Sequence, residues 1–141
     1  MKTEPVCLRR GCEGDLAAVA RIQAASPEAA QWEVRDYLAY DFVVAVSGDR
    51  IAGFAVARRL TEGESELLNL AVDPAFRRRG IGRGLVAQLT ASYTGTLWLE
   101  VRETNEAARK LYRTLGFCEA GQRPEYYRDS RERAIVMKFH S

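Results

Sequence analysis

Residues 70–82 read Leu70-Ala71-Val72-Asp73-Pro74-Ala75-Phe76-Arg77-Arg78-Arg79-Gly80-Ile81-Gly82. The first three end a β-rich run that begins at Glu66, so we predict a strand over 66–72 that stops at Asp73-Pro74. Apolar residues then recur at helical spacing from Gly82 to about Tyr93, which predicts a helix. A glycine-containing loop between a strand and a helix start leaves backbone N–H groups at the positive end of the helix dipole. The stretch therefore predicts an anion site.

The basic loop, defined here as residues Arg77–Arg83, has a composition that suits a phosphate group. Its members are Arg77, Arg78, Arg79, Gly80, Ile81, Gly82 and Arg83. The glycines allow the backbone to approach an anion closely, and the arginines add charge-assisted contacts to a diphosphate or a 3′-phosphate. The spacing matches neither G-x-x-x-x-G-K-S/T nor G-x-G-x-x-G. A solvated basic loop is the alternative, and the position between a strand and a helix favours the phosphate interpretation.

Composition limits the classes of protein that fit. The chain has 141 residues, the length of one domain, and we expect a single domain over 1–141. Hydrophobic residues make up 47% and charged residues 28%, which is typical of globular proteins. No apolar run approaches the roughly 20 residues that span a bilayer, and the start lacks a signal-peptide core, so we expect a cytoplasmic protein without membrane contacts. Three cysteines and one histidine at wide spacing predict free thiols and no metal site.

The remaining elements predict a mixed sheet. Periodicity predicts a first strand, helices over 15–25, 82–93 and after Asn105, and strands over 42–46, 51–56, 66–72, 97–101, 117–120 and 134–139. Ser26-Pro27-Glu28 is a further helix start signal, and the helix after it would carry Trp32 and Tyr37. The fold class is α/β (α+β), with a mixed central β-sheet flanked by helices on both faces.

Glu100 stands out in the strand predicted over 97–101. Leu97, Leu99 and Val101 alternate with Trp98 and Glu100, so the glutamate lies on the face opposite the aliphatic residues. Taken alone, this pattern fits an ordinary solvent-facing carboxylate.

Two blocks of the sequence resemble the GNAT superfamily of N-acetyltransferases. Residues 70–74 followed by the basic loop resemble its acyl-CoA signature, Gln/Arg-x-x-Gly-x-Gly/Ala. The block 97–117 is similar to bacterial ribosomal-protein-alanine N-acetyltransferases. The resemblance extends over roughly residues 5–139 and is strongest over 66–128. It implies the GNAT fold, with acetyl-CoA as co-substrate, no metal, and the N-terminal amine of a small-subunit ribosomal protein as acceptor.

The resemblance also implies roles for matching residues. Glu100 corresponds to the general base, acting directly or through a water, and Tyr112 to the general acid that protonates the CoA thiolate. In the segment Leu70-Ala71-Val72, the backbone N–H groups of the first and last residues would polarise the thioester carbonyl. Asn105 would contact the cofactor. Without the resemblance, Tyr112 reads as an aromatic residue at the edge of the core.

The acceptor site is less defined. Trp32, Tyr126 and Tyr127 are candidates for its lining, the two tyrosines in a polar loop before the last strand, and each also fits a packing role. Glu66 is either an amine contact or a surface charge at a strand end. The segment between Gly82 and Leu97 is shorter than in the family, and Glu132-Arg133 replaces an acidic pair.

These departures leave other functions open. A GNAT enzyme for a small-molecule amine or a protein lysine would share the whole cofactor half. A regulator that only binds acyl-CoA would not need a glutamate and a tyrosine at catalytic positions. A net charge of +2, with one basic patch and no aromatic platform around it, predicts no direct nucleic-acid partner.

Overall fold

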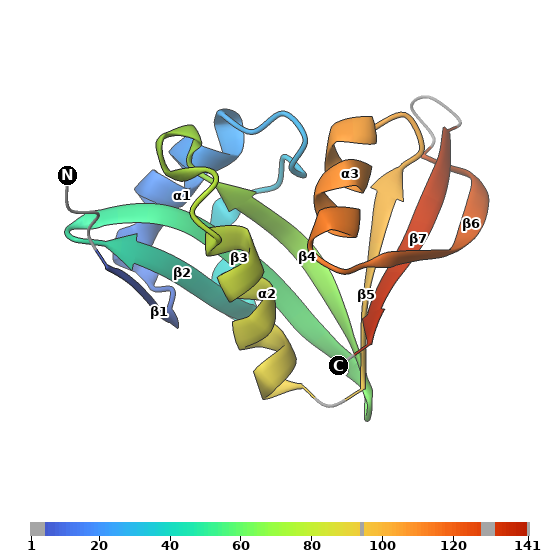
Figure 1. Ribbon diagram of the computed structural model, residues 1–141, viewed down its shortest axis with the longest axis horizontal. Coiled ribbons are helices and arrows are strands. Elements are labelled where there is room, and N and C mark those ends of the chain that lie inside the picture. Colours follow the sequence, from blue (N-terminus) through green and yellow to red (C-terminus); the bar gives the residue numbers. More distant parts are fainter. Residues whose placement is uncertain (1–4, 94, 128–131, 141) are drawn as a thin grey trace. The chain divides into compact units, whose positions relative to one another are not determined.

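The computed structural model describes residues 5–93, 95–127 and 132–140. Its strands and α-helices are β1 (Val6–Arg10), α1 (Leu16–Ala24), β2 (Asp41–Ser47), β3 (Arg50–Thr61), β4 (Glu64–Val72), α2 (Ile81–Ser92), β5 (Thr96–Arg102), α3 (Glu106–Thr114), β6 (Cys118–Tyr127) and β7 (Glu132–His140). Short 3-10 helices are η1 (Glu13–Asp15), η2 (Val34–Ala39) and η3 (Pro74–Phe76). In the described part of the chain the strands form one mixed sheet in the order β1-β2-β3-β4-β5-β7-β6 (Figure 1). This confirms the predicted fold class.

The chain divides into two compact units. Unit 1 comprises Met1–Arg58 and Leu67–Ser92, and unit 2 comprises Arg59–Glu66 and Tyr93–Ser141. The single domain over 1–141 stays a prediction.

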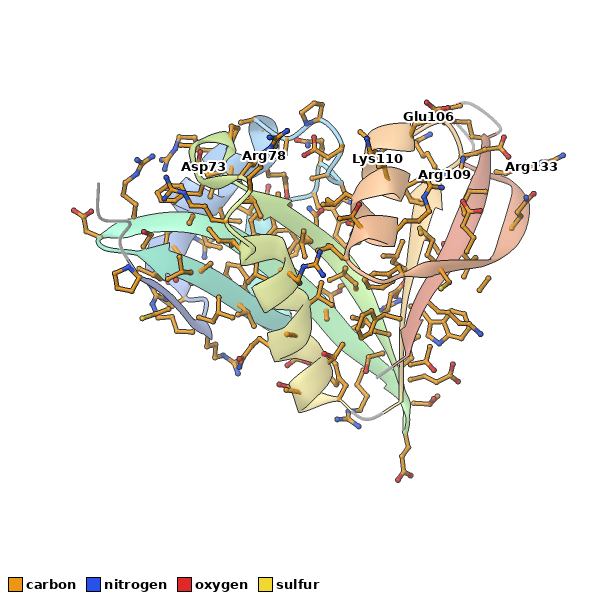
Figure 2. The ribbon with its side chains drawn as sticks, in the orientation of Figure 1. Asp73, Arg78, Glu106, Arg109, Lys110 and Arg133 are labelled. Carbon is orange, nitrogen blue, oxygen red and sulfur yellow. The ribbon has the colours of Figure 1, made fainter. Side chains whose placement is uncertain are left out.

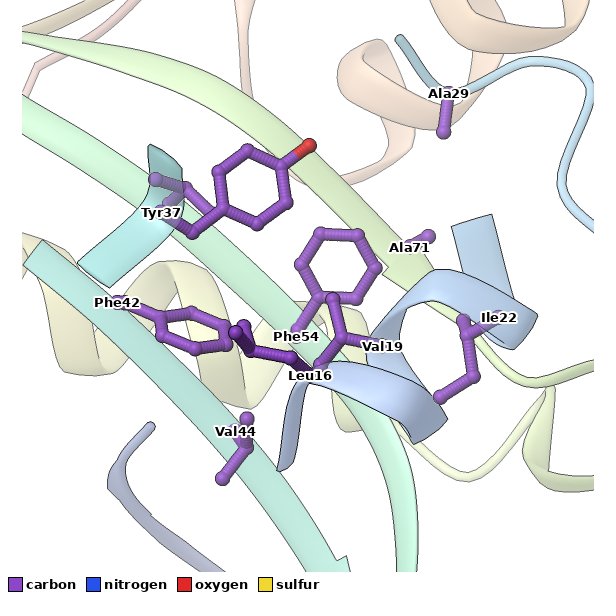
Figure 3. Close-up of a cluster of buried hydrophobic side chains, with 10 residues drawn as sticks. Leu16, Val19, Ile22, Ala29, Tyr37, Phe42, Val44, Phe54 and Ala71 are labelled. Carbon is purple, nitrogen blue, oxygen red and sulfur yellow. The ribbon is translucent and has the colours of Figure 1, made fainter. Parts of the chain in front are cut away.

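Helix α1 covers one face of the sheet in unit 1. Its apolar stripe, Leu16, Val19 and Ile22, is buried at helical spacing. Figure 3 shows this stripe packed with side chains from the strands, among them Phe42 of β2 and Phe54 of β3. The helix predicted over 15–25 is thus confirmed, and its amphipathic pattern is what docks it on the sheet.

Helix α2 covers the opposite face of the same unit. Gly53 alternates with Phe54 along β3 and therefore faces away from α1. A Cβ at Gly53 would lie 3.3 Å from Cγ2 of Ile81 and 3.0 Å from the carbonyl oxygen of Ala71. The absence of a side chain at Gly53 lets the start of α2 approach the sheet closely, with the two helices on opposite faces (Figure 1).

Unit 2 is built around β5 and β7. The two strands pair antiparallel, with Leu97 opposite Phe139 and Leu99 opposite Met137. Phe139 packs on Phe117 just after α3, with ring centroids 5.5 Å apart. The hydrophobic core of this unit therefore lies on the face of β5 that carries the aliphatic residues.

The segment that follows α1 differs from the sequence prediction. Ser26 does not cap a helix, because its Oγ donates 2.8 Å to the carbonyl of Ile22 at the end of α1. Residues 27–33 are irregular, and Tyr37 lies in the 3-10 helix η2. The helix predicted from Ser26-Pro27-Glu28 is therefore wrong. Local capping signals are outweighed here by hydrogen bonds to side chains from other elements.

The last hairpin is also longer than predicted. Strand β6 runs to Tyr127, so Tyr126 and Tyr127 end a strand rather than lying in a loop. Pairing with β7 extends the strand, with Tyr127 opposite Glu132. The side chains of both tyrosines lie outside the described residues. Among the described helices, none has the length and hydropathy needed to span a membrane.

Candidate functional site

The basic loop has a backbone shaped for an anion. Arg78 has φ +65° and Gly80 has φ +75°, so two left-handed residues flank Arg79. Turns of this kind direct neighbouring N–H groups to one side and form anion-binding concavities. Helix α2 begins directly after Gly80, whose carbonyl accepts the first helical hydrogen bond from the N–H of Gly84 at 2.9 Å. The loop thus adds the first-turn N–H groups of α2 and the helix dipole to its arginines.

The arginines of the loop have different environments. Arg77 donates to the carboxylate of Glu28 at 3.1 Å and to the carbonyl of Val72 at 3.3 Å. Arg79 lies 5.2 Å from the ring centroid of Phe76. Arg78, labelled in Figure 2, is exposed. The ion pairs among the described residues do not include it. Arg77 therefore shapes the loop, whereas the exposed Arg78 has its guanidinium available to a phosphate.

The other members of the loop divide between core and surface. Ile81 is 5% exposed and belongs to the core beneath α2, while Gly82 and Arg83 lie closer to solvent. A Cβ at Gly80 would meet no atom within 4 Å. The left-handed φ therefore selects glycine at this position, and open space beside it is what a bound phosphate requires. The described residues fit an acyl-CoA diphosphate.

Strand β4 leads into this loop through Leu70-Ala71-Val72. Leu70 and Ala71 are buried. The N–H of Leu70 donates to Oδ1 of Asn69 at 3.0 Å, so it is already engaged by a side chain. Of the two N–H groups predicted to polarise a thioester, the one of Val72 is the better candidate.

A buried polar network lies behind this strand, and sequence reasoning missed it. Gln23, Tyr37 and Asn69 are each at most 5% exposed and hydrogen-bonded to one another. Burial raises the pKa of Tyr37, which keeps its hydroxyl protonated. The only sequence signal is a polar amide inside the apolar run Leu67-Leu68-Asn69-Leu70.

Trp32 lies in the irregular segment that the network contacts. Its indole is 46% exposed, whereas its carbonyl accepts 2.7 Å from Nε2 of Gln23. Trp32, the predicted acceptor contact, is therefore a surface side chain on a hydrogen-bonded backbone. It does not pack in the core.

In unit 2, the position of Glu100 follows the sequence pattern. Leu99 and Val101 are buried on one face of β5, and Glu100 is half-buried on the other. Trp98 shares the face of Glu100, and its Nε1 donates 2.7 Å to Glu64. The predicted parity is confirmed, and it aims the carboxylate away from the core of the unit.

Helix α3 carries the other two predicted residues. Asn105 is its N-cap, with Oδ1 accepting from the N–H of Ala108 at 3.1 Å, so this side chain has a structural role besides any cofactor contact. Tyr112 is 8% exposed and packs edge-on against Phe117 at 5.6 Å. Tyr112 is more deeply buried than its neighbour Leu111.

The altered pair Glu132-Arg133, which begins β7, has a structural role. Glu132 accepts from Arg102 at 3.1 Å and also from the hydroxyl of Thr104, which ties the end of β5 to the start of β7. Arg133 is exposed and donates 3.1 Å to Gln122.

Each unit therefore groups its own candidates. Unit 1 contains Leu70-Ala71-Val72, the basic loop and the segment of Trp32, and unit 2 contains Glu100, Asn105 and Tyr112. Among the described residues, no cluster of three or more His, Cys, Asp or Glu is arranged to hold a metal ion.

Comparison with known proteins gives one consistent family. Residues 15–117 match the model of the Acetyltransferase (GNAT) family. The ribosomal protein bS18-alanine N-acetyltransferase of Salmonella typhimurium is 46% identical over 95 residues, which cover 63% of this chain and 64% of that protein. The N-alpha-acetyltransferase RimI of Mycobacterium tuberculosis is 42% identical over 101 residues, 69% of this chain and 64% of the relative. The aligned stretches thus span just under two thirds of these two relatives.

A solved structure extends the likeness over nearly the whole chain. The ribosomal-protein-S18-alanine N-acetyltransferase from Escherichia coli has a TM-score of 0.74 and 33% identity, covering 96% of this chain and 94% of that chain.

Proposed function

This chain belongs to the GNAT family of acetyltransferases, and from that premise we propose that it transfers the acetyl group of acetyl-CoA to the N-terminal α-amine of a ribosomal protein. The observation that carries the acetyl-CoA part is the basic loop, in which Arg78 and Gly80 adopt left-handed φ angles immediately before α2. The acceptor part, an N-terminal alanine of a small-subunit ribosomal protein, is supported by the names of the relatives from Salmonella and Escherichia coli. Such an acceptor would be met in the cytoplasm.

The loop and its preceding strand would hold acetyl-CoA, which supplies an activated thioester carbonyl. Backbone N–H groups at the start of α2 and the guanidinium of Arg78 bind the diphosphate. Arg77 holds the loop in place through Glu28 and the carbonyl of Val72. The N–H of Val72 stabilises negative charge as it develops on the carbonyl oxygen.

The acceptor amine needs a base. An α-amine has a pKa of about 7.7–8.0, so most of it is protonated at neutral pH and has no lone pair for attack. Glu100, half-buried on the polar face of β5, accepts that proton directly or through a water. The nitrogen then bonds to the acetyl carbon, the carbon–sulfur bond breaks, and the hydroxyl of Tyr112 donates a proton to the departing sulfur.

Acetyl transfer to a peptide panel tests the function. We would follow CoA release with peptides that begin with a free alanine, the same peptides with a blocked N-terminus, lysine-containing peptides, and small polyamines. Turnover restricted to free alanine termini is the expected result. Turnover of polyamines or lysine side chains instead would assign the chain to a different branch of the family, and no turnover of any amine would contradict the enzymatic assignment.

A further inference from the structure

The acceptor segment, defined here as residues 26–33, is irregular but held at several points. Nε2 of Gln31 lies within 3.3 Å of the carbonyl oxygens of Gln23, Ser26 and Ala29. Glu28 binds Arg77 of the basic loop. Polar side chains thus replace the hydrogen bonds that a helix would have supplied, and they give the segment a defined position.

Asn69 of β4 is the central contact of this arrangement. It is 2% exposed, and its side-chain amide pairs with both backbone groups of Ala30: Oδ1 accepts from the N–H at 3.1 Å and Nδ2 donates to the carbonyl at 2.8 Å. Oδ1 also accepts from the N–H of Leu70 at 3.0 Å. One side chain therefore connects the acceptor segment to the strand that leads to the thioester-binding residues.

Gln23 of α1 extends the contact from Asn69 to Trp32. Its Oε1 accepts from Nδ2 of Asn69 at 3.1 Å and from the hydroxyl of Tyr37 at 2.5 Å. Its Nε2 donates to the carbonyl of Trp32 at 2.7 Å. The side chains of Asn69, Gln23 and Tyr37 and the carbonyl of Trp32 all belong to unit 1. They form one continuous chain of hydrogen bonds.

Trp32 combines a fixed backbone with an exposed side chain. Its indole is 46% exposed, although tryptophan gains more from burial than most side chains. An exposed aromatic residue on an ordered backbone is typical of a binding contact, because little conformational entropy is lost when a ligand covers it.

We propose that Asn69 is a positioning residue for the acceptor: it holds the acceptor segment so that Trp32 is a preformed apolar contact for the first side chains of the acceptor peptide. The proposal rests on the proposed function, since it assumes a peptide acceptor. Asn69 touches no reacting atom in this scheme, and it acts through Ala30, Gln23 and Trp32.

The first test is the variant Asn69→Asp. It keeps the acceptor oxygen Oδ1 but replaces Nδ2, the donor to Ala30 and Gln23, with a second acceptor oxygen. We expect KM for an alanine peptide to rise at least ~10-fold, because one net hydrogen bond is worth about a factor of 10 and the substitution removes the donor to two acceptors. KM for acetyl-CoA should stay within about twofold of the wild type, because Asn69 acts on the acceptor segment and touches no reacting atom.

Two further variants separate positioning from loss of stability. Val44→Ala removes fully buried core volume on β2 without touching the network, and it should lower the melting temperature while leaving both KM values unchanged. Gln31→Ala changes an exposed residue and loosens the acceptor segment from its other side, so it should fold and raise only the peptide KM. If Asn69→Asp and Gln31→Ala leave the peptide KM unchanged, or raise both KM values equally, the positioning role is refuted.

A binding measurement without turnover completes the test. The chain has two tryptophans, so Trp98→Phe leaves Trp32 as the only one. In that background, Trp32 fluorescence should shift to the blue on addition of the alanine peptide. Asn69→Asp should lower its anisotropy before any peptide is added.

The two proposals fail in different ways. If the wild type acetylates no alanine peptide but the anisotropy of Trp32 falls in Asn69→Asp, the proposed acceptor is wrong and the positioning of the segment stands. If the wild type is active on these peptides and the anisotropy does not change, the positioning role is wrong and the function stands.

Discussion

Glu100 and Tyr112 occupy contrasting environments for residues proposed to move protons. The glutamate is half-buried on the polar face of a strand, whereas the tyrosine ring is almost fully buried and only its hydroxyl has polar chemistry to offer. Changes that remove one polar group while keeping side-chain volume should therefore separate catalysis from folding.

For Glu100→Gln we expect kcat/KM at neutral pH to fall at least about 100-fold, the lower end of what a positioned base contributes. Activity should recover as pH rises above the pKa of the acceptor amine, because more amine is then free without a base. Tyr112→Phe should lower kcat without this recovery. Steady-state kinetics across pH, with melting temperatures as a folding control, measure both effects, and near wild-type rates in both folded variants would contradict the acid–base scheme.

Asp15 gives a pH-dependent prediction for stability. Hydrogen bonds from Arg9 (2.7 and 2.9 Å), opposed by partial burial and helped by the N–H of Cys12, lower the pKa of Asp15 from 3.8 to about 2. A lowered pKa in the folded state means that the ionised carboxylate stabilises the fold above about pH 4, and that this contribution is lost between about pH 4 and pH 2. Asp15→Asn should reduce the free energy of unfolding at pH 7 by about 1–2 kcal/mol, since Arg9 is half-exposed and partly screened.

Urea titrations between pH 2 and pH 7 check this. The stability difference between wild type and Asp15→Asn should shrink as the pH falls through this window, and a constant difference would show that the carboxylate charge is not the cause.

At the scale of elements, α2 is placed by the glycine beneath it. Its buried residues Leu85, Val86 and Leu89 provide the hydrophobic packing. Gly53 sets how closely the first turn of α2 approaches β3 and β4. Because the same first turn forms the end of the basic loop, packing under α2 and anion binding are linked.

We therefore predict that Gly53→Val costs about 1–3 kcal/mol of stability through overpacking and also weakens acetyl-CoA binding. Gly121→Val is the matched control, because a Cβ there would meet no atom within 4 Å, and we expect it to stay within about 0.5 kcal/mol of the wild type. Chemical denaturation and calorimetric titration with acetyl-CoA measure the two effects. Equal responses of the two variants would show that close approach at Gly53 is unimportant.

At the scale of the whole molecule, the two units hold different parts of the proposed chemistry. The basic loop lies in unit 1 and the proposed proton-transfer residues lie in unit 2. The stabilisation that acetyl-CoA gives on binding should therefore depend on residues of the basic loop and not on the proposed proton-transfer residues.

Acetyl-CoA at about 100 times its Kd should add about 2.7 kcal/mol to the stability of the wild type. Glu100→Gln should keep this gain, whereas Arg78→Ala should lose much of it at the same ligand concentration. Thermal shifts with and without acetyl-CoA measure the gain. An undiminished shift in Arg78→Ala would remove this arginine from the binding site.

The sequence by itself determined the features that depend on short-range periodicity. The helix over 15–25, the strands over 42–46 and 51–56, the strand–loop–helix passage at the basic loop and the parity of Glu100 each follow from residues within about ten positions of one another, and the structure confirms them. The alternation of strand side chains is a property of the backbone, so it holds wherever the strand is placed.

Only the tertiary structure decided the state of the acceptor segment and the use of Arg77. Ala30 pairs with Asn69 across 39 positions, and Arg77 pairs with Glu28 across 49. The local signal at Ser26-Pro27-Glu28 favoured a helix, but the side chain of Asn69 satisfies both backbone groups of Ala30 in another conformation. Partners so far apart in the chain are brought together only by the folded sheet, because no periodicity within the segment encodes them.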